Sequence, residues 1–115
     1  MDSRVIIRHS TDSHSYDASI GDQVVGTIVY EPRDSRVVIR HTVVDPGFRG
    51  QGIASALAQF TLDDLTASGK TLTNYCGFIA DYMDRHPGYA TLVDPAKPGR
   101  AQPRDATLRA TEQRP

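Results

Sequence analysis

The most constraining feature of this chain is a β-branched run followed by a glycine-bearing turn and then by an apolar segment of helical spacing. Residues 36–44 form the run, residues 49–54 form the turn, and Pro46-Gly47 separates the two. β-Branched residues favour a strand, and apolar residues every three or four positions favour a helix. Such a strand, turn and helix direct backbone N–H groups and the positive end of a helix dipole at one point, where a phosphate would bind.

Length and composition limit what else the chain can be. Its 115 residues suit one domain, and its net charge of −1 does not indicate a basic surface for binding nucleic acid. Cys76 is the only cysteine, so no internal disulfide forms, and the four histidines lack metal-ligand spacing. No apolar stretch is long enough to cross a bilayer. We therefore expect a soluble, cytoplasmic protein with no metal, nucleic-acid partner or membrane contact.

The first half predicts an antiparallel meander. Short β-prone segments at residues 5–7, 14–20 and 24–30 precede the strong strand at 36–44, with turns at 10–13, 21–22 and 32–35 between them. Strict alternation would put one set of residues of the strong strand on a shared face, namely Val37, Ile39, His41 and Val43. The lone glycine in the third segment, Gly26, predicts either a bulge or the close approach of a ligand.

The second half predicts a parallel crossover. A helix at about residues 50–68 ends at Gly69, a strand at 70–75 follows, and a second helix follows Cys76 until Pro87-Gly88. Two strands joined by a helix should be parallel and connected right-handedly. From residue 94 onward, proline and singly spaced charges replace large apolar residues, which predicts a disordered tail at 94–115 after one domain at 1–93.

The turn itself carries the first chemical hypothesis. Gly50 and Gly52 let the backbone approach an anion, and the fork of Arg49 can grip two phosphate oxygens. The Gly-Lys-Ser/Thr ending of a P-loop is missing, and the spacing differs from a dinucleotide fingerprint. On this pattern alone, a tight turn without any ligand stands as an equal alternative.

Longer segments resemble a known family, the small single-domain GNAT-like N-acetyltransferases. The likeness covers roughly residues 23–93 and is carried by Arg40-His41-Thr42, by the segment from Asp45 to Leu57, by Cys76 to Met83 and by Arg85 to Tyr89. It implies an α/β (α+β) fold of GNAT type, with a mixed sheet, an antiparallel N-terminal meander, one parallel β-α-β crossover and a C-terminal helix.

The resemblance also implies a site for acetyl-CoA as co-substrate. The pantetheine arm would lie in a splay between the strand ending at Val44 and the strand at 71–75, and the loop would hold the pyrophosphate mainly through backbone amides. The thioester would sit near mid-sheet, with His41 and Cys76 as polar neighbours. The expected cofactor-binding residues are Val43, Val44, Arg49, Gly50, Gln51, Gly52, Ile53 and Ala54.

Each candidate catalytic residue has an ordinary alternative. Cys76, at a helix N-terminus, could carry the acyl group, line the thioester pocket or serve as a small buried hydrophobe. His41 could act as general base, activate Cys76 or be a half-buried sheet histidine. Tyr82 and Tyr89 are candidate general acids, with packing favoured for Tyr82. Two further pairs are expected to be solvated, Asp63-Asp64 on a helix edge and His9 with His14 in an early turn.

The sequence thus predicts an acetyl-CoA-dependent N-acyltransferase that acts on a small-molecule or protein amine as a monomer or weak homodimer. It departs from the family pattern at Val43 and Gly88, where glutamate is frequent, and at Asn74, where proline is frequent. These departures leave a second reading open, a non-catalytic module that binds CoA or acyl-CoA. A third and weaker reading is a thiol-reactive protein that depends on Cys76 alone.

Overall fold

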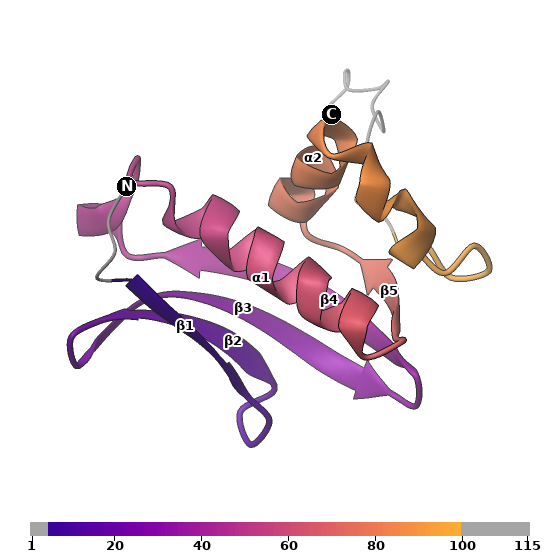
Figure 1. Ribbon diagram of the computed structural model, residues 1–115, viewed down its shortest axis with the longest axis horizontal. Coiled ribbons are helices and arrows are strands. Elements are labelled where there is room, and N and C mark those ends of the chain that lie inside the picture. The colour runs from indigo at the N-terminus through magenta and orange to yellow at the C-terminus, as the bar shows by residue number, and fades with distance from the viewer. Residues whose placement is uncertain (1–4, 100–115) are drawn as a thin grey trace.

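The computed structural model describes residues 5–99, which form one mixed sheet packed against helices (Figure 1). Within these residues the strands follow one another across the sheet in sequence order. They are β1 (Val5–Ser10), β2 (Ser15–Ile20), β3 (Gln23–Arg33), β4 (Arg36–Val44) and β5 (Thr71–Asn74). β1 to β4 pair antiparallel and β4 pairs with β5 in parallel, so the predicted meander and crossover are confirmed.

Helix α1 (Ile53–Ala67) makes the crossover, and α2 (Gly77–Arg85) follows β5. Two short 3-10 helices, η1 (Pro46–Phe48) and η2 (Pro87–Leu92), flank them. α1 begins at Ile53 rather than at residue 50 because Gly50 and Gly52 have φ of +82° and +79°, which a right-handed helix cannot include. Gly69, with φ of +70°, ends the helix as expected.

The helices lie on one face of the sheet, which we call the inner face; the opposite face is the outer face (Figure 1). The core between helices and sheet is continuous, and its largest fully buried side chains are Tyr16, Ile28, Ile39, Leu57, Leu62, Leu65, Leu72 and Ile79. Gly26 permits this packing, because an added Cβ would lie 3.0 Å from Leu57 Cδ1 and 3.1 Å from Ile53 Cγ2. The register shift beside Gly26 agrees with the predicted bulge, and the close approach at this glycine is that of helix α1 and not of a ligand.

A β-bulge in β4 changes the predicted faces of that strand. Val29 pairs with His41 while the next residue, Tyr30, pairs with Ile39, so Arg40 is an extra residue in the ladder. Ile39 is buried on the inner face, whereas Arg40 and His41 are both exposed. The prediction that His41 shares a face with Val37 and Ile39 is therefore wrong, since the bulge moves His41 to the outer face.

The chain after η2 runs along the free edge of β5. The Asp94 N–H donates to Leu72 O at 2.8 Å, and the Asn74 N–H donates to Pro98 O at 3.0 Å. Residues 94–99 therefore contact the domain whose predicted end was 93. Residues 100–115, the rest of the predicted tail, lie outside the described residues, and the predicted disorder of 94–115 stays a prediction.

Candidate functional site

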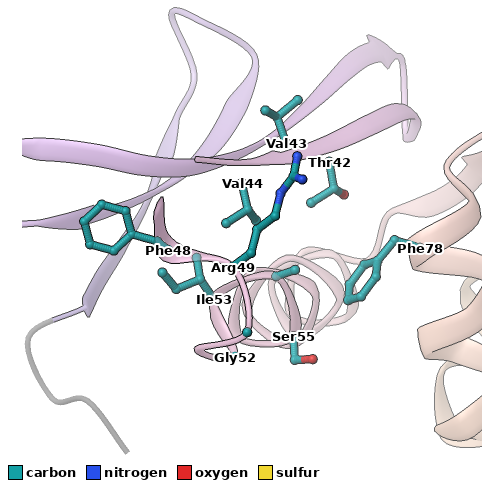
Figure 2. Close-up of a pocket in the computed structure, with 11 residues that line it drawn as sticks. Thr42, Val43, Val44, Phe48, Arg49, Gly52, Ile53, Ser55 and Phe78 are labelled. Carbon is teal, nitrogen blue, oxygen red and sulfur yellow. The ribbon is translucent and has the colours of Figure 1, made fainter. Parts of the chain in front are cut away.

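A cavity of about 500 Å³ opens where β4, the glycine turn and the start of α1 meet (Figure 2). Its position follows from the topology: β5 pairs with β4 only as far as Ile39, so the edge of β4 from Arg40 to Val44 has no neighbouring strand among the described residues. Phe78 of α2 forms the opposite wall. The lining residues are Thr42, Val43, Val44, Phe48, Arg49, Gly50, Gly52, Ile53, Ala54, Ser55 and Phe78.

The turn at this cavity presents backbone donors without acceptors. Gly52 is the N-cap of α1 and has no side chain to cap the helix, and the first intrahelical bond runs from the Ala56 N–H to Gly52 O at 3.0 Å. The N–H groups of Ile53, Ala54 and Ser55 therefore have no partner within the helix. Space around the glycines is open, since an added Cβ at Gly50 or Gly52 would meet no atom within 4 Å.

Arg49 supplies the cation at this cavity. Its side chain extends from the loop across the opening toward Thr42 and Val43 (Figure 2). No carboxylate of residues 5–99 forms an ion pair with it. A free guanidinium beside unpaired backbone donors at a helix N-terminus can bind phosphate oxygens. These groups thus fit the pyrophosphate of coenzyme A.

Cys76 lies where β5 passes into α2, as the N-cap of that helix. It is 6% exposed, and its Sγ is 3.4 Å from Oγ1 of Thr42, a residue that lines the cavity. The side chain of Asn74, which is 1% exposed, bonds both the N–H and the C=O of Cys76. Its Oδ1 accepts from the Cys76 N–H at 3.0 Å, and its Nδ2 donates to Cys76 O at 2.9 Å. The cysteine is therefore rigidly held across the gap from β4.

The structure separates the predicted pair of His41 and Cys76. Cys76 contacts Thr42, while His41 projects from the outer face, and no hydrogen bond joins the two among the described residues. Seven of the eight residues predicted to bind cofactor line the cavity; Gln51, the eighth, lies in the loop without lining it. This describes their positions, and their roles stay predictions.

The other polar candidates are engaged in packing contacts. Tyr82 is 6% exposed, stacks on His86 at 4.1 Å, and burial raises its pKa. The Tyr89 hydroxyl donates to Asp63 Oδ1 at 2.6 Å, which raises the pKa of Tyr89 to about 12. Asp64 accepts from the Tyr16 hydroxyl at 2.6 Å. Asp63 is exposed as expected, whereas Asp64 is half-buried, so the expectation of a solvated pair is wrong for Asp64.

His9, expected in a turn, lies in β1 instead. Its ring stacks on Tyr16 at 4.2 Å and forms a 2.5 Å hydrogen bond with the Tyr30 hydroxyl. The histidine is thus part of the packing between β1, β3 and α1.

Sequence reasoning missed Thr42, Phe48, Ser55 and Phe78 as lining residues. The spacing of Phe78 and Tyr82 is helical, which indicates packing and gives no sign of the cavity. Strict alternation along residues 36–44 would place Thr42 on the face opposite Ile39, whereas the bulge turns it toward the cavity. A bulge leaves no mark in this run except the polar Arg40-His41 pair between apolar residues.

A family model described as "GCN5-related N-acetyl-transferase" matches residues 15–92. This match covers most of the chain, and the chain belongs to that family. The resemblance and the GNAT-type fold predicted from the sequence are thereby confirmed. Members of this family generally use acetyl-CoA. A glycine turn with groups that could hold a pyrophosphate is consistent with such a cofactor.

Solved structures that are similar to this chain include N-acetyltransferases of several kinds. The ribosomal-protein-S18-alanine N-acetyltransferase from Escherichia coli is 16% identical, with a TM-score of 0.49. The match covers 64% of this chain and 43% of the Escherichia coli protein. Ard1 from Thermoplasma volcanium is 23% identical, with a TM-score of 0.49. The match covers 56% of this chain and 45% of Ard1. This chain thus spans less than half the length of either.

A third similar structure is an aminoglycoside acetyltransferase from an uncultured soil metagenomic sample, in complex with sisomicin. It is 18% identical with a TM-score of 0.46, covering 71% of this chain and 57% of its own. A comparison with curated proteins gave no match.

Two further observations bear on binding classes. No helix within residues 5–99 is long and apolar enough to span a membrane. The same residues contain no group of three or more His, Cys, Asp or Glu side chains that could hold a metal ion. The compartment and the oligomeric state stay predictions.

Proposed function

We propose that this protein transfers an acetyl group from acetyl-CoA to an amine. The observation that carries the proposal is the cavity between the edge of β4 and the glycine turn. Within residues 5–99, this cavity combines backbone donors that have no acceptor with an Arg49 guanidinium that has no ion-pair partner. A family match alone would leave open whether this short chain retains the cofactor site. The cavity supports its retention.

In this proposal the loop and the strand divide the binding of the cofactor. The backbone from Gly50 to Ala54 and the Arg49 side chain hold the pyrophosphate, and Gln51 contributes through its backbone only. Val43 and Val44 line the path of the pantetheine arm, and the unpaired edge of β4 offers it hydrogen bonds. Phe78 closes the opposite side and excludes water.

The acyl transfer would occur in the gap near Cys76. The amine nitrogen attacks the thioester carbonyl, a C–N bond forms, the C–S bond breaks, and the coenzyme A thiolate takes up a proton. His41 receives the proton that the amine loses, as a general base beside the gap. Thr42 and Cys76 form the polar inner wall of the gap.

Two alternatives follow from specific observations. Cys76 could first accept the acyl group through Sγ, a route favoured by its rigid placement beside the cavity. The chain could instead bind CoA without transferring the acyl group, which the valine at position 43 favours. Both alternatives keep the cofactor site and differ in the chemistry.

One experiment separates these possibilities. The protein is incubated with acetyl-CoA and its intact mass is measured; amines are then added and the release of CoA is followed. Amine-dependent release supports the transferase. An acetyl adduct that disappears in Cys76→Ala establishes the acyl-enzyme route. Binding without amine-dependent release would establish the binding module, and absence of CoA binding would overturn both readings.

A further inference from the structure

The outer side of the gap between β4 and β5 carries an ordered charged cluster. The last bond between the two strands is from the Tyr75 N–H to Ile39 O, at 2.8 Å, after which the chain turns into α2. The bulge places Arg40 and His41 together on the outer face beside this opening. The inner side is occupied by the cavity and covered by Phe78. Among the described residues, the outer face therefore offers a second reactant an open route to the gap.

Arg40 is fixed at this opening by two neighbours. Its Nε and Nη2 donate to Glu31 at 3.0 and 3.2 Å, and its guanidinium lies over the Tyr75 ring at 4.7 Å from the centroid. Nη1 of Arg40 has no acceptor within residues 5–99. One donor edge of an immobilised guanidinium is thus available beside the gap. We call Glu31, Arg33, Arg40 and Tyr75 the outer-face cluster.

The charges of this cluster do not cancel. Glu31 accepts from Arg33 at 2.9 Å as well as from Arg40, so two guanidinium groups share one carboxylate. Arg40 holds the pKa of the Glu31 carboxyl below its usual range, which keeps Glu31 ionised. Arg36, on the same face, is balanced by Asp94 at 3.8 Å. One positive charge therefore remains to attract an anionic group.

We propose that the acceptor is an acidic peptide whose carboxylates contact Arg40 on the outer face while its amine enters the gap beside His41. This inference rests on the proposed function. A peptide fits better than a small molecule because no helix among the described residues covers the outer face, where Val43 is 54% exposed beside the gap. The reaction is the acyl transfer given above: the amine gains the acyl group, coenzyme A leaves as the thiol, and the amine proton passes to His41.

The test uses the full chain and three lysine peptides that differ only in their flanking residues, which are glutamate, glutamine or arginine. We expect kcat/KM to fall from the acidic to the neutral to the basic peptide, with at least about tenfold between the extremes, or about 1.4 kcal/mol. Arg40→Glu should invert the order, and the milder Arg40→Gln should flatten it. The dissociation constant of CoA should stay unchanged in both variants.

Arg8→Glu provides the matched control. Arg8 is an exposed arginine on the outer face of β1, three strands away from β4, so the same charge reversal there should leave the order of the peptides intact. Free glutamate is included as a small amine with a carboxylate. Its acetylation as fast as the acidic peptide would overturn the peptide assignment.

Failure of this proposal is distinguishable from failure of the proposed function. Equal turnover of the three peptides, or an unchanged order in both Arg40 variants, would overturn the acidic-peptide proposal while leaving the transferase intact. CoA binding with no turnover of any amine would overturn both.

Discussion

The two ends of α1 both carry polar groups, but only one end leaves them unsatisfied. Its 15 residues place the ends about 22 Å apart. At the C-terminal end, Asp64 accepts from Tyr16 and lies 3.5 Å from His9, which in turn bonds Tyr30. At the N-terminal end, the glycine turn and Arg49 have donors that find no acceptor in the part of the chain that the structure describes.

This contrast shows that residue type alone is a poor guide to a site. The histidine, tyrosines and aspartate at the C-terminal end have the side chains of a catalytic cluster, yet they satisfy one another and join β1, β2 and β3 to α1. The turn at the other end contains mostly glycine and small residues. Unused hydrogen-bonding capacity next to a cavity distinguishes it.

The largest effect should come from a pair of glycine variants, one at each end of α1. Gly52 and Gly69 are both left-handed, with φ of +79° and +70°, and an added Cβ meets nothing within 4 Å at either position. Valine at either site should cost about 1–3 kcal/mol of unfolding free energy. Only Gly52→Val should also weaken CoA binding, by about 100-fold or 2.7 kcal/mol, because its side chain enters the phosphate space.

Urea unfolding and calorimetric titration with CoA measure the two quantities. Equal CoA affinities in Gly52→Val and Gly69→Val would refute the assignment of the turn as a phosphate site. Loss of affinity in both would mean that strain in the helix, rather than blocking of the turn, controls binding.

The next effect tests the structural role of the C-terminal end. Asp64→Ala removes the acceptor of the Tyr16 hydroxyl, and Tyr16 is only 2% exposed, so the unpaired hydroxyl should cost about 2 kcal/mol of unfolding free energy. CoA affinity should not change. The neighbouring variant Asp63→Ala loses its bond to the partly exposed Tyr89 and should cost less. A stability loss in Asp63→Ala as large as in Asp64→Ala would contradict this ranking.

Arg49→Ala should have an intermediate effect on binding. Removing one charged partner of the phosphates should weaken CoA affinity about tenfold and reduce its dependence on salt. Stability should stay near that of the unmodified protein, since Arg49 has no ion-pair partner in the described part of the chain. Arg85→Ala, which breaks an exposed ion pair with Asp81 on α2, is the control and should leave affinity unchanged.

Much of this arrangement was predictable because it is local in sequence. The run at 36–44, the turn at 49–54 and the apolar periodicity after it predict β4, the loop and α1, and the parallel partner follows from the crossover. The bulge at Arg40 was not predictable, because it depends on how β3 pairs with β4 across the sheet. That single insertion decides that Thr42, and not His41, contacts Cys76. The bonds of Asp63 and Asp64 to Tyr89 and Tyr16 are likewise tertiary and leave no sequence pattern.

The smallest effect concerns Tyr89, whose hydroxyl donates a hydrogen bond to Asp63 in the C-terminal half of α1. The hydrogen bond raises its pKa from 10.0 to about 12, so folding favours the protonated phenol. The resulting stabilisation is fully present below about pH 10 and disappears as the pH rises toward 12. Because the pair is partly exposed, Tyr89→Phe should cost at most about 1 kcal/mol at neutral pH. Unfolding measured from pH 8 to pH 11 should show the two proteins converging, and a difference that stays constant or grows would mean that Asp63 does not hold the Tyr89 proton.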